Sequence, residues 1–242
     1  MINLNKRLTL RQVFKSHSKM FAKKKKIETV DTREQLLKTA AKLFGEKGFE
    51  AVSTRELAKV ADVNIAMIAY YFGSKEGLFK AMIEERFPKT VSHLRNIQKT
   101  EGSAWDKISA VIDLYAEKMM GDSSFHKLIF RELSLEQRPE HRELILSGIE
   151  KNWEVIKTYI REGQESGEFK EDIDIELTIA SVFGTIFQLI NMPAWTIRLL
   201  GEKDEKFVKS EAFKIRMKKH LKEMMQAHLF TAEFATKMPP SV

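Results

Sequence analysis

Residues 53–78 read STRELAKVADVNIAMIAYYFGSKEGL, and this stretch decides the fold. Ser53 with Glu56 three residues later is a capping box, in which each side chain satisfies a free backbone N–H at the start of a helix. That helix is short, and Asn64 is a second cap residue before another short helix over residues 65–72. Helices this short and this close cannot bury themselves and must cross a third. The pattern predicts a helix-turn-helix, whose second helix fits the major groove of DNA.

The sequence on either side supplies the other helices of this domain. Apolar residues at i, i+3, i+4 and i+7 spacing predict a helix over residues 33–47, with Gly48 as its end signal. A further helix is expected from Lys75 to Phe87, ended by Pro88, because proline lacks the backbone donor that would continue a helix. Three short helices therefore make up the domain, and a fourth leads out of it.

Helical periodicity continues through the rest of the chain, where glycine and proline are sparse. We expect five more helical segments, over residues 103–120, 123–136, 139–166, 174–200 and 209–230. The predicted fold is all-α with about nine helices: an N-terminal three-helix, homeodomain-like domain and a larger C-terminal helical bundle. The expected division is a basic extension over residues 1–30, a DNA-binding domain over 31–77 and a C-terminal effector-binding and dimerisation domain over 78–242.

Positive charge is concentrated at the N-terminal end. The formal net charge is +7; residues 1–90 hold 19 Lys and Arg against 10 Asp and Glu, whereas the remainder holds 22 against 24. This asymmetry is typical of a phosphate-binding module joined to a nearly neutral body. Part of it belongs to residues 1–30, which we expect to form a mobile tail or an arm that touches DNA. Met20, just before a run of four lysines, is an alternative start of translation.

Several classes of function are excluded by what the sequence lacks. Without cysteine the chain has no disulfide, thiolate metal site or cysteine nucleophile. The six histidines show no metal-ligand spacing, and neither a P-loop nor a Gly-x-Ser-x-Gly elbow is present. We therefore expect no enzyme activity, no catalytic residues, no metal and no cofactor. No apolar run reaches about 18 residues and no signal peptide is visible, so we expect a cytoplasmic protein without a membrane partner.

Five stretches of the N-terminal domain, in their order and spacing, resemble the tetracycline-repressor (TetR) family, including its AcrR-like members. They are LLKTAAKLF (36–44), KGF (47–49), STRELA (53–58), ADVN (61–64) and YYFGSKEGL (70–78). The resemblance spans residues 33–86, under a quarter of the chain. Two positions depart from the family pattern, because Asp62 stands where glycine is common and Ala69 where tyrosine is usual.

The resemblance implies a transcriptional repressor that reads DNA and leaves it when a small effector binds. By position, the residues expected at the DNA are Thr54, Arg55, Asn64, Ile65, Ala66, Met67, Tyr70, Tyr71 and Lys75. Thr54, Arg55 and Lys75 would contact phosphates, with the dipole of its helix assisting Lys75. The groove-facing residues are mostly apolar, so we expect readout through thymine methyl groups, tyrosine contacts and DNA shape.

The resemblance also implies a homodimer on a near-palindromic operator. Dimerisation would use two long helices, Asp174–Leu200 and Ala212–Phe230. The first is apolar nearly all round, so it must be covered both by its own domain and by a partner. The alternative is that Asp174–Leu200 is the central core helix of a monomer.

Aromatic and methionine side chains recur at helical spacing in the C-terminal domain. Singly, such residues are more often part of a core, but together they suit an adaptable apolar cavity. We expect an apolar effector to contact Tyr115, Met119, Phe130, Trp153, Phe183 and Phe187.

Two functions of other classes stay open on these residues. One is an architectural or division-control protein that binds DNA without a small effector. The other is an interaction module whose helix-turn-helix contacts protein, although the positive charge of the N-terminal third argues against it.

Overall fold

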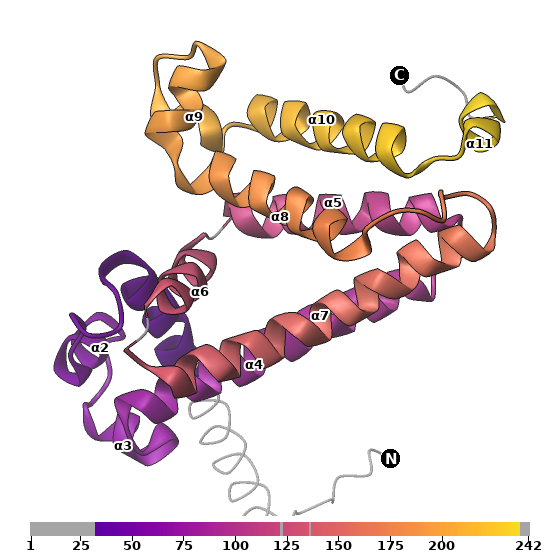
Figure 1. Ribbon diagram of the computed structural model, residues 1–242. Helices are drawn as coiled ribbons and strands as arrows, with labels where there is room; N and C mark the ends of the chain where they lie inside the picture. The colour runs from indigo at the N-terminus through magenta and orange to yellow at the C-terminus, as the bar shows by residue number, and fades with distance from the viewer. Residues whose placement is uncertain (1–31, 122, 136, 238–242) are drawn as a thin grey trace, which may run out of the picture.

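The computed structural model describes residues 32–121, 123–135 and 137–237. Within them a helix over residues 32–47 is followed by ten α-helices, α2 to α11, and one 3-10 helix, η1. Figure 1 shows a small N-terminal domain, in indigo and purple, at one end of a longer helical body. The predicted all-α class is confirmed. The predicted basic extension over residues 1–30 lies outside the described residues.

α2 (Thr54–Val60) forms where the capping box predicted it. The hydroxyl of Ser53 accepts a hydrogen bond from the backbone N–H of Glu56 at 3.1 Å. The carboxylate of Glu56 pairs with Lys47 at the end of the preceding helix, instead of closing the other half of the box. The same carboxylate therefore ties α2 to the 32–47 helix.

The turn before α3 (Ala66–Phe72) uses the residues that the sequence indicated. Asp62 adopts a φ of 50°, a left-handed conformation that aspartate reaches more easily than most residues. The side chain of Asn64 accepts the N–H of Ala66 at 2.9 Å, which confirms its capping role. An aspartate can thus stand where relatives of this sequence pattern commonly have glycine.

The N-terminal domain does not have a core of its own. Its buried apolar cluster starts in the helix over residues 32–47 and continues into α4 (Lys75–Gln98), α6 (Ser124–Ser134) and the start of α7 (Pro139–Glu165). The expected division at residue 77 therefore does not coincide with a gap in packing. The DNA-reading helices share this cluster with α4, α6 and the start of α7, while the rest of the body has a second cluster of its own.

α4 continues well beyond its predicted end at Phe87. Pro88 lies inside the helix, where its ring and missing N–H would ordinarily break or kink it. Thr90 and Leu94, beyond the proline, are buried, and α4 packs along α7 (Figure 1). The expectation that Pro88 ends this helix is wrong, because packing against α7 outweighs one lost hydrogen bond.

α4 and α7 run parallel and join the N-terminal domain to the body. Near their first turns, the rings of Phe79 and His141 stack with centroids 3.9 Å apart. Near their far ends, the hydroxyl of Tyr159 donates a hydrogen bond to the carbonyl of Leu94. Contacts at both ends make this pair the long axis of the molecule.

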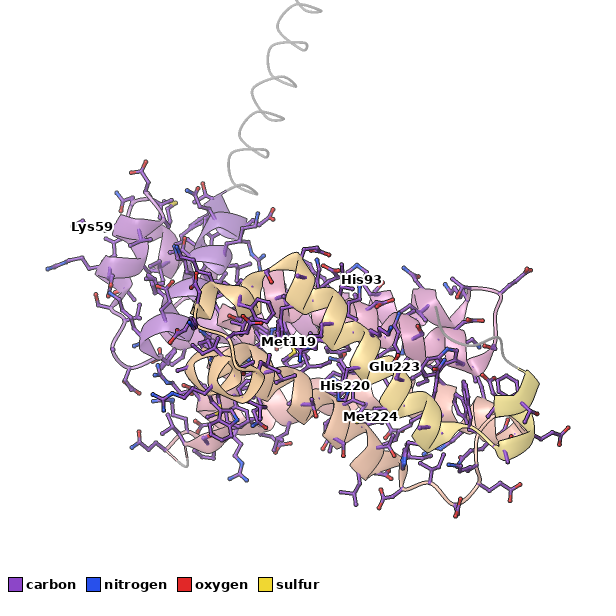
Figure 2. All side chains as sticks on the ribbon, turned by 90° about the horizontal axis from the view of Figure 1, so that it is seen from above. Lys59, His93, Met119, His220, Glu223 and Met224 are labelled. Carbon is purple, nitrogen blue, oxygen red and sulfur yellow. The ribbon has the colours of Figure 1, made fainter. Side chains whose placement is uncertain are left out.

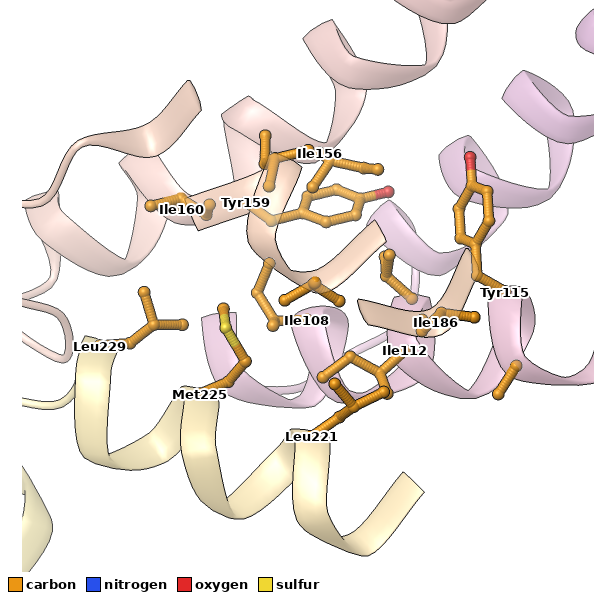
Figure 3. Close-up of a cluster of buried hydrophobic side chains, with 14 of the residues drawn as sticks. Ile108, Ile112, Tyr115, Ile156, Tyr159, Ile160, Ile186, Leu221, Met225 and Leu229 are labelled. Carbon is orange, nitrogen blue, oxygen red and sulfur yellow. The ribbon is translucent and has the colours of Figure 1, made fainter. Parts of the chain in front are cut away.

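The body is built from α5 (Ala104–Gly121), α7, α8 (Ile175–Asn191) and α10 (Glu211–Leu229). Each helix turns an apolar stripe inward, so that the buried side chains form one cluster. Figure 3 shows members from all four helices: Ile108, Ile112, Ile156, Tyr159, Ile160, Ile186, Leu221, Met225 and Leu229.

The predicted segment 174–200 is two helices rather than one. α9 (Pro193–Leu200) starts at its proline, and its axis is bent by 97° from that of α8. Pro193 cannot donate the hydrogen bond that would continue α8, but it fits the first turn of a new helix. Among the described residues, no single helix is long and apolar enough to cross a bilayer, and only the bent pair of α8 and α9 reaches that length and composition.

The other predicted segments correspond to α5, α6, α7 and α10 within a few residues. Two short elements were not expected: η1 (Glu205–Lys209) before α10, and α11 (Ala232–Lys237) after it. η1 has five residues and α11 has six, which is too few for a helical pattern of apolar residues to be visible in the sequence.

Candidate nucleic-acid interface and effector cavity

α3 presents an apolar face to solvent. Its buried side chain, Ile68, anchors the helix to the domain core. Ile65, Ala66 and Ala69 are exposed, and Tyr70 is 73% exposed. The face offers methyl groups and one phenol hydroxyl where many recognition helices carry amides and guanidinium groups. Such a surface fits thymine methyl groups in the major groove.

Tyr71 and Met67 support this face from behind. Both are half-buried and pack against the core cluster of the domain. The ring of Tyr71 meets that of Tyr70 edge-on, with the centroids 4.9 Å apart. The structure therefore brings the predicted residues of α3 together, with Tyr70 outermost and Tyr71 positioning it.

The start of α2 adds polar groups beside that face. Arg55 is exposed there, and Thr54 next to it is half-buried. Lys59, near the end of the helix, projects from the outer end of the domain in Figure 2. Cationic and hydroxyl side chains in these places can position a protein on the phosphate backbone.

The Lys75 side chain points inward, towards the loop that precedes α2. Its ammonium donates hydrogen bonds to the carbonyls of Phe49 at 2.9 Å and Val52 at 3.0 Å. It also lies 4.2 Å from the centroid of the Phe49 ring. In this conformation Lys75 fastens the loop between the 32–47 helix and α2, because those inward carbonyls satisfy its donors. The phosphate contact expected for Lys75 stays a prediction.

One cavity in the body brings the predicted effector residues together. Its volume is about 320 Å³, and its wall includes residues of α4, α5, α6, α7 and α8. Six of its lining residues are those predicted: Tyr115, Met119, Phe130, Trp153, Phe183 and Phe187. Tyr115 meets Phe183 edge-on at 4.3 Å between centroids, and Phe130 stacks on Phe187 at 4.2 Å. The size lies within the range of small-molecule sites.

The wall of this cavity towards α4 is cationic. Lys118 donates a hydrogen bond to the hydroxyl of Thr90 at 3.0 Å, and the guanidinium of Arg86 lies 5.0 Å from the centroid of the Phe125 ring. Burial, and secondly the charge of Arg86, lower the pKa of Lys118 to about 8. Burial also raises the pKa of the Tyr115 hydroxyl, which keeps it a neutral donor. The cavity is thus apolar and aromatic with one positive side.

α6 stands between this cavity and the DNA-binding domain. Phe130 and Leu133 line the cavity, whereas Glu132 points elsewhere and is only 2% exposed. The guanidinium of Arg138 donates two hydrogen bonds to the Glu132 carboxylate, each 3.0 Å long, and Nδ1 of His141 lies 3.1 Å from it. Burial opposes ionisation, but these hydrogen bonds hold the pKa of Glu132 below its ordinary value.

The partners of Glu132 reach the DNA-binding domain directly. Arg138 pairs with Glu50 and lies over the ring of Phe49, 5.2 Å from its centroid. His141 stacks on Phe79 and meets Phe49 edge-on, with centroids 4.7 Å apart. This cluster connects α6 and α7 to the loop that Lys75 also fastens.

A second link lies at the other end of α6. Gly45, near the end of the 32–47 helix, packs on the backbone of Ser124. A Cβ atom at Gly45 would lie 2.2 Å from the carbonyl oxygen of Ser124, closer than real contacts allow. Only glycine therefore permits this approach of the N-terminal domain to α6.

The helices predicted to dimerise leave apolar side chains uncovered. Leu177 on α8 and Ile215 on α10 are exposed, as are Trp195 and Leu199 on α9. Figure 2 also labels His220, Glu223 and Met224 along α10. The dimer through these helices stays a prediction.

No metal site is found among the described residues: no three His, Cys, Asp or Glu side chains there are grouped to hold an ion. Sequence reasoning missed the polar part of the cavity, namely Arg86, Thr90, Lys118 and Asn152. The first two could have been found by continuing α4 through Pro88, because they are four residues apart on one face.

Comparison with known proteins agrees with this arrangement. Residues 36–82 match the family described as "Bacterial regulatory proteins, tetR family", and residues 83–208, more than half of the chain, match "YsiA-like protein, C-terminal region". The chain is 28% identical over 143 residues to the Bacillus subtilis "Probable HTH-type transcriptional regulator YttP", covering 58% of this chain and 68% of that protein.

A second relative is the "Fatty acid metabolism regulator protein" of Bacillus subtilis, 25% identical over 159 residues, which cover 64% of this chain and 80% of the relative. The crystal structure of FadR from Bacillus subtilis, in complex with stearoyl-CoA, has the same fold, with a TM-score of 0.60 and 23% identity over 78% of this chain and 96% of that one. The chain therefore belongs to the tetR family of bacterial regulatory proteins, and it is a DNA-binding transcriptional regulator, not an enzyme.

Proposed function

We propose that this protein is a cytoplasmic, sequence-specific repressor that a small effector with an apolar body releases from its operator. The observation that carries the proposal is the aromatic cavity of about 320 Å³, walled in part by α6. Through Glu132, the same helix is bonded to residues that hold the DNA-binding domain. A ligand that moves α6 would therefore also move the DNA reader.

Relatives support a fatty-acyl chain as the apolar body. One relative is named as a regulator of fatty acid metabolism, and FadR was crystallised with stearoyl-CoA. An unbranched hydrocarbon chain suits a cavity lined by aromatic rings and methionine, because the flexible methionine side chain adapts to its shape. The effector of this protein is proposed to belong to this class.

The proposed operator is near-palindromic and bound by a homodimer. The uncovered side chains Leu177 and Ile215 support pairing through α8 and α10. In such a dimer the two α3 helices would lie about 34–36 Å apart, one turn of DNA. Light scattering of the purified protein should give the mass of a dimer.

The decisive experiment is selection of bound sequences from a random DNA library at physiological salt. A palindromic motif would support the repressor, and release of that DNA by an alkyl-chain compound would support the effector. Salt-sensitive binding without a motif would favour the architectural alternative instead. Absence of binding would argue for a helix-turn-helix that contacts protein.

Replacing Arg55 by alanine is expected to weaken DNA binding on every sequence by a similar factor. One phosphate contact would be lost, so the slope of log affinity against log salt should fall by about 1. Lys99→Ala, which removes a charge at the far end of α4, is the matched control and should leave the slope unchanged. Loss of binding to one sequence only would contradict the phosphate assignment.

Replacing Tyr70 by alanine should weaken binding to the operator alone and leave the salt dependence of binding unchanged, in contrast to Arg55→Ala. We expect an approximately tenfold loss of affinity for the selected operator, about 1.4 kcal/mol, with the salt slope intact. The measurement is a salt titration of binding to the operator and to a scrambled duplex. An equal loss on both duplexes would show that Tyr70 does not read bases.

A further inference from the structure

The effector cavity contains charge that a purely apolar ligand would not need. Lys118 of α5 and Arg86 of α4 both line it. Within residues 32–121, 123–135 and 137–237, neither has a carboxylate at ion-pair distance; Lys118 has the neutral hydroxyl of Thr90 and Arg86 has the ring of Phe125. Both cations are half-buried, and two like charges side by side that lack a carboxylate partner repel each other and destabilise a fold. A ligand that supplies the counter-ion would remove that penalty.

The same cations also border a second hollow of about 300 Å³ on the side of the N-terminal domain. Arg86, Thr90 and Lys118 line both spaces and form the wall between them. Across the second hollow lies the helix over residues 32–47, which contributes Leu37 and Ala41. A group held at this shared wall would therefore lie beside the DNA-binding domain.

The acidic residues of the second hollow do not neutralise this wall. Glu34 pairs with Lys38 at 2.9 Å, and Glu85 pairs with Arg33. Burial together with the Arg86 charge lowers the pKa of Lys118, as expected for an ammonium that no carboxylate of the described residues pairs with. As far as the described part of the chain is concerned, the positive charge of the wall is left for a ligand.

We infer that the effector is an amphiphile whose anionic group is held by Lys118 and Arg86 while its apolar part fills the aromatic cavity. The inference rests on the proposed function, because it assigns the polar end of the same ligand. A carboxylate and the phosphates of an acyl thioester share the required chemistry. Charge-assisted hydrogen bonds from ammonium and guanidinium groups suit either one.

The test compares ligands that differ only in their charged end. Matched pairs of octanoate with octanol, dodecanoate with dodecanol and hexadecanoate with hexadecanol are titrated into the full-length protein. Binding is followed by calorimetry and by intrinsic tryptophan fluorescence, to which Trp153 at the cavity contributes. Dodecanoyl-CoA is titrated as well, and its affinity is compared with that of dodecanoate. The comparison tells whether the anionic group is a free carboxylate or belongs to a thioester conjugate.

Wild-type protein should bind the anionic member of the matched pairs at least about tenfold more tightly than the alcohol. Lys118→Met should abolish the preference for the acid and leave the affinity for the alcohol unchanged. Lys118→Arg, which keeps the positive charge, should keep the preference for the acid. Lys99→Met, with the same change of charge far from the cavity, should behave as wild type. Because Lys118→Met removes an uncompensated charge, it should also raise the melting temperature of the ligand-free protein.

The outcomes separate this inference from the proposed function. Equal binding of acid and alcohol, or a preference that survives Lys118→Met, would overturn the anionic site and leave the apolar effector standing. A lower melting temperature of Lys118→Met would also overturn it, because Lys118 would then stabilise the fold. If no compound of any length binds or releases DNA, the apolar effector itself is wrong.

Discussion

Glu132→Leu is expected to destabilise the protein by about 3–5 kcal/mol, because it leaves Arg138 and His141 without their buried anion. Leucine has a similar volume, so the loss would come from the lost polar partner rather than from a cavity: His141 would lose its carboxylate, and Arg138 would keep only its pair with the exposed Glu50. Chemical unfolding of the ligand-free protein measures it directly. In Glu154→Gln, which breaks an exposed pair with Lys157, the loss should stay below about 1 kcal/mol.

The pH dependence distinguishes a lost charge from poor packing. The native pKa of Glu132 lies below its ordinary value of 4.5. Its contribution to stability is therefore complete above that pH and disappears as the pH falls through the lower native pKa. The difference between wild type and Glu132→Leu should narrow in acid. A constant difference across pH would show that leucine is harmful through its shape.

The same substitution should weaken communication with DNA. The Glu132 cluster bonds α6 to the loop containing Phe49 and Glu50. Without it, effector binding should persist while the effector-induced loss of operator affinity shrinks. If the effector lowers the operator affinity of Glu132→Leu as much as that of the wild type, the signal reaches the DNA-binding domain by another route.

Gly45→Ala is the second change with a large expected effect. Alanine is the better helix former by about 1 kcal/mol, so propensity alone predicts stabilisation. The added Cβ would meet the carbonyl oxygen of Ser124 at 2.2 Å, a backbone atom that cannot rotate away. We therefore expect the opposite sign, a net loss of about 1–3 kcal/mol, together with displacement of the N-terminal domain from α6.

Gly121→Ala is the matched control, because a Cβ at this last residue of α5 has nothing within 4 Å. It should be neutral or stabilising in thermal unfolding. If Gly45→Ala also stabilises, the close contact between the two domains does not persist in solution.

The DNA-binding domain was predictable because its signals are local. Ser53, Asn64 and Asp62 act within three residues of their own positions, so the sequence contains nearly all of their geometry. Pro88 shows the limit of such reasoning. Whether a proline ends a helix depends on what packs beyond it, and α7 is distant in sequence.

The candidate sites likewise contain residues that the sequence predicted and contacts that it did not. Aromatic and methionine side chains at helical spacing indicated the six cavity residues, since one face of each helix must point inward. The hydrogen bonds of Lys75 could not be predicted, because its partners Phe49 and Val52 lie more than twenty residues away on a loop. Nor could Lys118 be predicted, because it looks like an ordinary surface residue until α4 and α5 are placed side by side.

The uninterrupted course of α4 through Pro88 has a mechanical consequence. Its 24 residues span about 36 Å from the end of α3 to the far side of the body. Arg86 and Thr90 sit near the middle of this rod, at the cavity wall. If the rod pivots as a stiff lever about its distant end, a tilt of about 5° displaces its first turn by about 3 Å, close to the rise of one base pair. A helix broken at Pro88 would absorb such a tilt at the hinge and transmit little of it.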